Sequence, residues 1–432
     1  MKKAKYLGIF IILIAAVALA ACQPATPATE EPMAEEPAAE EPAAEEPTAE
    51  EPMESAMPED EWGVIEVAPG DPVRIATNTV TSGAGVDVFG INQNRFAALA
   101  VEDLGGEVLG HPIELVAEDT LCSAEGGQTA ASKTVNDPSI AAVMGHTCSS
   151  SCVPAAEIYA QAGYTMVSPS CTAPSLAGYP DMATHQVSFL RSVFNDLGQG
   201  KFAAEWAFNE LGARSVATIH DGSPYAQQLV QVFTDNFTAL GGEVVAAEAV
   251  NVGDTDMRPV LTTIAAAGPD LIYVPIFPAE GGFIAQQRAD VGLEDVPMMG
   301  ADGLQTATFI EAGGDAAEGQ YASGPALPES DAFQAVLDKY VAEFNEEPPA
   351  PFGPNAYDGI LMIVDAIKKV AVEGEDGTLY IGRKALNDAL YATDGLQGIT
   401  GSFTCDERGD CAFAQGIAVY QVQDGAWVQV TD

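Results

Sequence analysis

Residues Gly145–Thr172 read GHTCSSSCVPAAEIYAQAGYTMVSPSCT, and this stretch decides how the chain is organised. It follows an apolar run at Ala141–Met144, and a second apolar run, Thr165–Ser168, lies within it. A segment with helical spacing, Val153–Ala162, separates the two runs, and hydroxyl side chains follow each run. The pattern predicts strand, polar turn, helix, strand and polar turn. Open parallel sheets bind ligands beyond the carboxyl ends of their strands, so we expect Ser149–Ser151 and Ser170–Thr172 to form one pocket.

The chain around this stretch alternates short β-branched runs with segments of helical spacing. A first series extends from Val73 to Arg191, and a second, with a predicted strand at Ser215–His220, extends from Lys201 to Gly300. Such alternation predicts βαβ units on mostly parallel sheets. Two series of similar length predict two similar three-layer lobes. No sequence repeat with a period of about 20–50 residues is visible, which argues against a solenoid.

The last quarter of the chain has a different character. Two long amphipathic segments, Asp331–Phe344 and Ala356–Glu373, precede a shorter one at Arg383–Tyr391. Only short strands are predicted beyond Gly401. We expect this tail to complete both lobes, with the chain crossing between them more than once.

The N-terminus has the composition of a bacterial export signal. Lysines lie within the first five residues, and Leu7–Ala21 is an uncharged apolar run too short to span a bilayer comfortably. The junction Leu19-Ala20-Ala21-Cys22 resembles a lipobox. We therefore expect residues 1–21 to be removed and Cys22 to carry the lipid that anchors the protein to a membrane; an ordinary signal peptide with an unrelated cysteine is the alternative.

Residues 22–61 form a loose repeat of Pro, Ala and Glu, in which Glu30–Glu61 holds 14 acids and no base. Low hydrophobicity and self-repelling charge predict a disordered, extended tether. In the whole chain, 63 acidic residues face 17 basic ones. Binding of phosphates requires clustered Lys and Arg, so the composition argues against a nucleic-acid partner.

Six cysteines remain after Cys22, an even number that favours disulfides in an exported chain. Cys405 and Cys411 flank the turn-rich segment DERGD, and we expect them to bridge each other. Three of the other four lie in the opening stretch. The four are Cys122, Cys148, Cys152 and Cys171.

Zinc binding is the alternative for these cysteines, together with His146. The spacing H-x-C-x3-C followed by a distant Cys171 matches no common zinc pattern, and exported cysteines tend to oxidise. We therefore expect no metal site.

Several motifs, in this order and spacing, resemble the leucine/isoleucine/valine-type amino-acid-binding proteins of bacterial ABC importers. Besides the opening stretch they are Ser82-Gly83, GGEVLGHPIEL (Gly105–Leu115), HDGSPYAQQL (His220–Leu229) and MGADG (Met299–Gly303). The similarity extends from about Val73 to Asp432. It implies a periplasmic-binding-protein type I fold of class α/β, with two Rossmann-like three-layer lobes, a three-strand hinge and a ligand cleft between the lobes. We place lobe 1 at residues 72–191 plus 326–402 and lobe 2 at 192–325 plus 403–432.

The resemblance implies that the first lobe binds the ligand backbone. Ser149 corresponds to the serine that holds the ligand carboxylate, and Ser170 and Thr172 to the pair that grips carboxylate and ammonium. Phe89 stands where an aromatic side chain covers the ligand. Ser149 and Ser150 also precede a predicted helix, whose free N–H groups and positive dipole end favour an anion.

The second lobe is expected to supply the other half of the site. Asp302 occupies the place of an acidic residue that pairs with the ligand ammonium, and Tyr225 that of a closing aromatic. Phe277 matches another aromatic wall, although its segment PIFPAEGG departs from the family's tyrosine-rich version. Because a zwitterion would contact both lobes, only the closed state would collect both sets of contacts.

The resemblance also implies a disulfide between Cys122 and Cys148. That pairing leaves Cys152 and Cys171 for a second disulfide, across the two binding turns.

A hydrolase is a rival interpretation, built on Ser149, His146 and Asp119. The chain has no G-x-S-x-G elbow around these serines, and three serines in a row argue against one positioned nucleophile. We therefore expect no enzymatic activity and no cofactor.

We expect a monomeric, lipid-anchored, extracytoplasmic binding protein. Its ligand would be a small amino acid with a branched-chain or other aliphatic side chain, delivered to the permease of an ABC importer. The alternative is a sensory receptor lipoprotein of the same fold that binds an amide, urea or another polar solute without transport.

Overall fold

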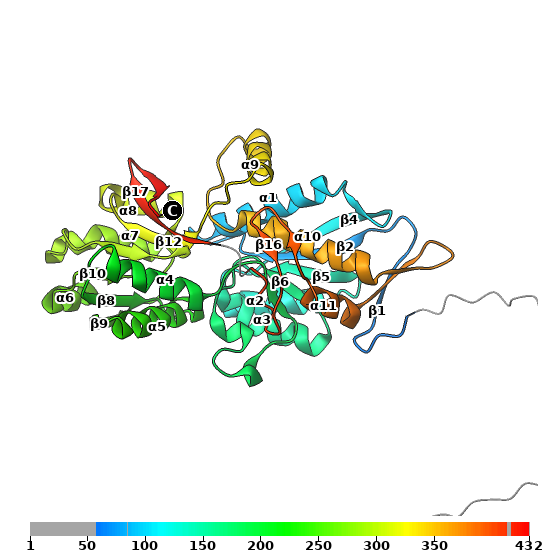
Figure 1. The fold of residues 1–432 in the computed structure, drawn as a ribbon, viewed down its shortest axis with the longest axis horizontal. Helices are drawn as coiled ribbons and strands as arrows, with labels where there is room; N and C mark the ends of the chain where they lie inside the picture. The colour runs from blue at the N-terminus through cyan, green and yellow to red at the C-terminus, as the bar shows by residue number, and fades with distance from the viewer. Residues whose placement is uncertain (1–57, 84, 413–415, 432) are drawn as a thin grey trace, which may run out of the picture. The chain divides into compact units, whose positions relative to one another are not determined.

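The computed structural model describes residues 58–83, 85–412 and 416–431 (Figure 1). The predicted signal peptide, Cys22 and all of the tether before residue 58 lie outside the described residues. Within the described ranges, no helix is long and apolar enough to cross a membrane.

The first sheet has six strands in the order β3-β4-β2-β5-β6-β7. All neighbours pair in parallel except β3, which is antiparallel to β4. Helices cover both faces of this sheet, so its central strand β2 is buried at every position except Arg74. The strands are β2 (Val73–Thr79), β3 (Glu107–Val108), β4 (His111–Asp119), β5 (Ile140–Gly145), β6 (Met166–Ser168) and β7 (Phe189–Arg191).

Two groups of helices pack against this sheet. Adjacent residues of β2, Ile75 and Ala76, belong to different hydrophobic clusters because successive side chains point to opposite faces. One face carries α1 (Asp87–Asp103), α9 (Asp331–Phe344), α10 (Gly353–Val370) and α11 (Arg383–Tyr391), and the other α2 (Ala124–Val135) and α3 (Ser149–Ala162).

Helix α2 approaches the start of α3 closely because it carries glycine. A Cβ atom at Gly127 would lie 2.4 Å from the carbonyl oxygen of Ser151. Any larger residue would push the two helices apart, and with them the first of the two hydroxyl-rich turns.

The second sheet has seven strands in the order β18-β17-β12-β11-β10-β8-β9. Strand β17 pairs antiparallel with β12 and with β18, whereas the other neighbouring strands pair in parallel. The strands are β8 (Ser215–His220), β9 (Glu243–Ala249), β10 (Leu271–Tyr273), β11 (Met298–Gly300), β12 (Tyr321–Pro325), β17 (Ile417–Gln423) and β18 (Ala426–Gln429). Its helices are α4 (Asp196–Asn209), α5 (Pro224–Ala239), α6 (Arg258–Ala267), α7 (Pro278–Gln287) and α8 (Ala307–Gly313).

The chain passes between the two sheets three times. It leaves the first sheet after β7, returns after β12 and leaves again after β16 (Ser402–Phe403). The tail therefore completes both lobes, as the sequence predicted: α9, α10 and α11 join the first, and β17 and β18 the second. Cys411 and Ala412 still pack in the core of the first lobe. The lobe boundaries placed at residues 191, 325 and 402 stay predictions.

The described residues also contain short strands that the sequence did not predict. A three-stranded sheet ties the N-terminal segment to the tail, and a two-stranded one precedes the third crossing. These strands are β1 (Val64–Val67), β13 (Val372–Glu373), β14 (Leu379–Gly382) and β15 (Leu396–Gln397), the last paired with β16.

Candidate functional site

A cavity of about 20 Å³ lies where the carboxyl ends of both sheets meet. In the first lobe, α1 follows β2, and the two hydroxyl-rich turns follow β5 and β6; in the second, the lining residues follow β8, β10 and β11. Six of the predicted site residues line the cavity: Phe89, Ser149, Ser170, Tyr225, Phe277 and Asp302. Four further lining residues were not predicted: Thr147, Cys148, Gly303 and Phe352.

The first turn differs from its prediction. The sequence placed the three serines before a helix that begins at Val153, but α3 begins at Ser149, with Cys148 as its N-cap. The start at Val153 was wrong because the carbonyl of Cys148 accepts hydrogen bonds from both Ser151 and Cys152, which closes one more helical turn. Pro154 therefore lies inside the helix instead of starting it.

Because α3 starts earlier than predicted, two backbone N–H donors at its cavity end remain without a partner among the described residues. Between described residues, no hydrogen bond uses the N–H of Ser149 or Ser150. The Ser149 hydroxyl accepts from the N–H of Ala173 at 3.3 Å and so ties the first turn to the second. Ser150 is half-buried and does not line the cavity. The positive end of the 14-residue helix thus faces the site with unused donors.

The second turn is held by a network that the sequence did not reveal. The Ser170 hydroxyl accepts from Nε2 of Gln93 at 2.8 Å and donates to the carbonyl of Thr147 at 2.7 Å. Oγ1 of Thr147 donates to Oε1 of Gln93 at 2.8 Å. Gln93 is fully buried on α1, one turn after Phe89. The sequence signal for this network was Gln93 itself, a polar residue at a position of the helix where the spacing predicts an apolar one.

Thr172 lies behind the cavity and does not line it. The side chain is fully buried, and its hydroxyl interacts with the carboxyl of Asp196 without a hydrogen bond of good geometry. Its carbonyl accepts from the N–H of Asp196 at 3.0 Å, so the turn reaches the first residue of α4 in the second lobe.

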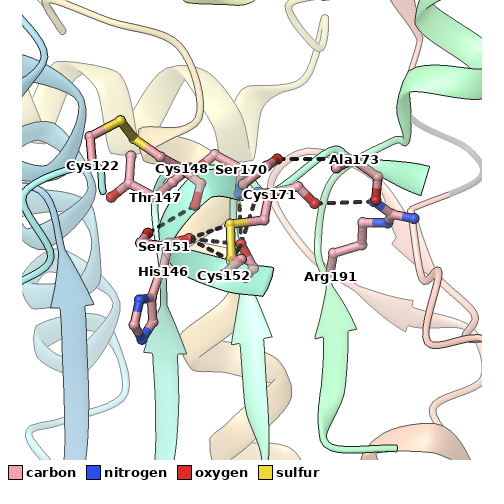
Figure 2. Close-up of a disulfide and its surroundings, with 12 residues drawn as sticks. Cys122, His146, Thr147, Cys148, Ser151, Cys152, Ser170, Cys171, Ala173 and Arg191 are labelled. Atoms are coloured by element: carbon pink, nitrogen blue, oxygen red, sulfur yellow. Dashed lines mark hydrogen bonds between the residues drawn. A yellow bond between two sulfur atoms is a disulfide. The ribbon is translucent and has the colours of Figure 1, made fainter. Parts of the chain in front are cut away.

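Disulfides fix the two turns relative to each other and to α2 (Figure 2). Cys152–Cys171 joins the first turn of α3 to the turn after β6, with Cα atoms 6.4 Å apart. The sequence-based pairings are confirmed, since the three disulfides of the described chain are Cys122–Cys148, Cys152–Cys171 and Cys405–Cys411. Closing a loop of about 20 residues in this way contributes about 3 kcal/mol to the free energy of unfolding.

The closing lobe presents a buried carboxyl group. Asp302 follows β11, and its Oδ1 accepts from Nε2 of Gln199 at 2.7 Å and from the Tyr225 hydroxyl at 3.3 Å. The Tyr225 hydroxyl in turn accepts from the N–H of Gly303 at 3.2 Å. Burial raises the pKa of Asp302 to about 6, against the opposing effect of these donors.

Aromatic rings from both lobes form the apolar wall. Phe277 packs edge-on against Phe89, with ring centroids 6.1 Å apart, and against Tyr225 at 5.7 Å. Phe352, which the sequence analysis did not single out, completes the wall and packs on Phe194 of the first crossing. Its segment PPAPFGP gave no helix or strand pattern, so only the fold brings the ring to the site.

A larger groove of about 690 Å³ lies on the other side of Phe352, which lines both spaces. Apolar side chains, six prolines among them, dominate it, and its charged residues are Glu346 and Glu347. Among the described residues its lining is acidic with no basic residue, so the smaller cavity, which offers both a free N–H group and a carboxyl group, is the better candidate site.

The residues of the rival interpretations do not assemble. His146 is buried, its Nε2 lies 2.9 Å from the Tyr159 hydroxyl, and burial lowers its pKa to about 3. Asp119 instead accepts from Ser82 and from the N–H groups of Thr81 and Leu121. Cys148, Cys152 and Cys171 are all in disulfides and so are not thiolate ligands.

Two three-layer α/β lobes with three crossings and a cavity at their facing strand ends define a periplasmic-binding-protein type I fold. The sequence profile of the family described as periplasmic binding protein matches residues 72–426, and the chain belongs to this family. The resemblance noted from the motifs is thereby confirmed.

The chain is similar to several named relatives. A leucine-, isoleucine-, valine-, threonine- and alanine-binding protein of Pseudomonas aeruginosa is 29% identical over 345 residues, 79% of this chain and 87% of the relative. The crystal structure of a leucine-binding protein, LivK, from Thermotoga maritima superposes with a TM-score of 0.74 at 25% identity, over 83% of this chain and 98% of that one. A branched-chain amino acid transporter substrate-binding protein, LivJ, from Streptococcus pneumoniae, in complex with isoleucine, gives 0.71 at 26% identity, over 83% and 100%.

Proposed function

We propose that this protein binds a small amino acid with a branched-chain or other aliphatic side chain and delivers it to the permease of an ABC importer. One observation carries the proposal: the free N–H group of Ser149 and the buried carboxyl group of Asp302, supplied by different lobes, line one cavity with apolar walls. A zwitterion is the class of ligand whose two charges match these two groups. The names of the relatives described above support the same choice.

The carboxylate of the ligand would bind at the start of α3. The N–H groups of Ser149 and Ser150 have no partner among the described residues, and the helix dipole favours an anion there. The hydroxyls of Ser149 and Ser170 line the same place. Ser150 takes part through its backbone only.

The ammonium of the ligand would pair with Asp302. This carboxyl is 6% exposed, and an ammonium group close to it would compensate a charge that water reaches poorly. Phe89, Phe277 and Phe352 would then surround an aliphatic side chain.

Opening and closing of the lobes are part of this function. A volume of about 20 Å³ holds about one water-sized sphere, so an amino acid requires the walls to move apart before it enters. Contacts to both lobes would then favour the closed state, since only that state satisfies donors and carboxylate together.

The remaining expectations complete the proposal. We propose that the protein acts outside the cytoplasm as a monomer, that Cys22 anchors it through a lipid after removal of residues 1–21, and that residues 22–61 act as its tether. Lobe 1 would comprise residues 72–191 and 326–402, and lobe 2 residues 192–325 and 403–432. The site would perform no chemistry on the ligand, because no general base contacts the Ser149 hydroxyl within the described residues.

Calorimetric titration with an amino-acid panel tests the proposal. We expect leucine, isoleucine or valine to bind one-to-one, and the matched analogues isocaproate, which lacks the ammonium, and isopentylamine, which lacks the carboxylate, to bind far more weakly. Binding of urea or acetamide without any amino acid would instead establish the sensory alternative, which neither charged end of the cavity favours.

A further inference from the structure

A second carboxyl group, Asp196, lies buried behind the ammonium end of the cavity. It is the first residue of α4, and its side chain is fully buried. Neither oxygen of its carboxyl group has a hydrogen bond of good geometry within the described residues, and the donor that interacts with it is the hydroxyl of Thr172. Burying a carboxylate with so few donors is unfavourable, so this position requires an explanation.

Helix α4 places this group beside the other carboxyl. Gln199, one turn after Asp196, donates to Oδ1 of Asp302, while the backbone of Asp196 donates to Thr172. Asp196 thus stands between the second binding turn of one lobe and the acidic residue of the other. The buried Oε1 of Gln199 is also without a partner among the described residues.

The positive charge nearby is already engaged. Arg191 faces Asp196, but its Nε donates to Asp410 and its Nη1 to the carbonyls of Cys171 and Ala173, at 3.1 and 3.2 Å (Figure 2). Its Nη2 has no partner in the described part of the chain. Arg191 therefore holds the binding turn and balances Asp410, which leaves the two carboxyls without a full counter-charge.

The other titratable groups facing the pair are phenols. Burial, and next the charges of Asp302 and Asp196, raise the pKa of Tyr225 well above its usual value, and the same causes raise that of Tyr273. Both phenols are therefore neutral at physiological pH. Burial, followed by the charge of Asp302, also raises the pKa of Asp196 well above its usual range.

We propose, on the basis of the amino-acid-binding function above, that Asp196 and Asp302 form a pair that holds one proton in the empty site and releases it when a ligand ammonium enters. Two neighbouring buried carboxyls do not both ionise without a compensating cation. The ammonium supplies that cation, both carboxyls become ionised, and the proton leaves to solvent. Asp196 would then act as a specificity-determining residue, because a ligand without a cation does not displace the proton.

Proton release is measured by titrating L-leucine into the full-length protein in buffers of different ionisation enthalpy. We expect release of about one proton per bound leucine near pH 7, where Asp302 alone would be mostly ionised, and release close to zero for Asp196→Asn. This variant keeps the shape of the side chain, and its amide can still interact with the hydroxyl of Thr172. Asp256→Asn, at an exposed carboxylate, serves as the matched control and should behave as wild type. Leucine binding without proton release, or equal release from Asp196→Asn, would overturn the proposal.

The empty site is tested separately by infrared difference spectroscopy of wild type against Asp196→Asn at neutral pH. We expect the carbonyl stretch of a protonated carboxyl to be present in wild type and lost in the variant; Asp196→Ser replaces it if the asparagine variant does not fold. Absence of that band would sink the shared proton regardless of ligand. Failure of every amino acid to bind, with the band present, would contradict the proposed transport function and leave the proton pair standing.

Discussion

At one end of the cavity a ligand would meet backbone N–H groups of α3, and at the other the side chain of Asp302. The first end is fixed in several ways: two disulfides, the hydrogen bond between Ser149 and Ala173, and the network around Ser170 hold it. The second end depends on carboxyl groups whose charge changes with pH and with what lies beside them. One lobe therefore supplies a permanent, rigid anion site, whereas the other supplies an adjustable cation site, whose charge depends on pH and on the ligand.

The largest effect is expected when the carboxyl group of the cation site is removed. Asp302→Ala deletes one partner of a buried charge pair, which costs about 3–5 kcal/mol. We therefore expect leucine affinity to fall by about a thousandfold in calorimetric titration, while isocaproate binding changes far less. The exposed Asp315→Ala provides the control. An Asp302→Ala protein that binds leucine as wild type does would show that the ammonium lies elsewhere.

The rigid end is tested through its disulfide. Replacing Cys152 and Cys171 by serine should lower the free energy of unfolding by about 3 kcal/mol and weaken leucine binding, because the two turns lose their mutual alignment. Replacing Cys405 and Cys411, which close a shorter loop, should lower it by about 2 kcal/mol and leave affinity unchanged. Chemical denaturation measures both. Equal loss of affinity in the two double variants would mean that the disulfide acts on stability alone.

Acidification should affect only one end. Burial raises the pKa of Asp302 to about 6, and an ammonium binds the ionised form. In Asp196→Asn, leucine affinity is therefore expected to be highest above this pKa and to fall by up to tenfold, about 1.4 kcal/mol, for each pH unit below it. In wild type, binding also releases the proton of the carboxyl pair, so the fall should begin near neutral pH. Titrations between about pH 8 and pH 4.5 measure the slope. The same series on Asp302→Ala should be nearly flat, and a steep slope there would assign the titration to another group.

The smallest effects separate backbone from side chain within the rigid end. Ser150→Ala keeps the N–H that would bind the carboxylate and should change leucine affinity by less than about twofold. Ser149→Ala also loses a hydroxyl that lines the cavity and accepts from Ala173, which is expected to cost about 1 kcal/mol, or about fivefold. Parallel titrations of the two variants decide the order, and a larger loss from Ser150→Ala would contradict it.

Much of the fold was readable because its elements are long and strongly patterned. The helix Arg383–Tyr391 and the strand Ser215–His220 have the predicted bounds. Strands β7 and β12 were missed. β7 has only three residues, too few to establish a period, and β12 ends in Gly-Pro, which is typical of a turn. The start of α3 was misplaced because Pro154 suits a first turn, whereas the turn before it closes through Cys148.

Only the part of the candidate site that is formed by residues close together in the sequence could be predicted from the pattern. Hydroxyls after two neighbouring strands indicated an anion site from the sequence pattern. The supporting polar groups come from distant positions: Gln93 is 77 residues from Ser170, and Gln199 is 103 from Asp302. Phe352 reaches the cavity from a loop without a period. A local sequence pattern does not encode such contacts, because they depend on the packing of the two lobes.

The small volume of the cavity limits how fast a bound ligand dissociates. A ligand enclosed in walls that leave about 20 Å³ cannot depart until the lobes separate, so its dissociation is never faster than opening. Hinge motions of this kind occur in microseconds to milliseconds. Release at a transporter would accordingly depend on what holds the lobes apart, and a partner that stabilises the open state would unload the cargo without touching the ligand.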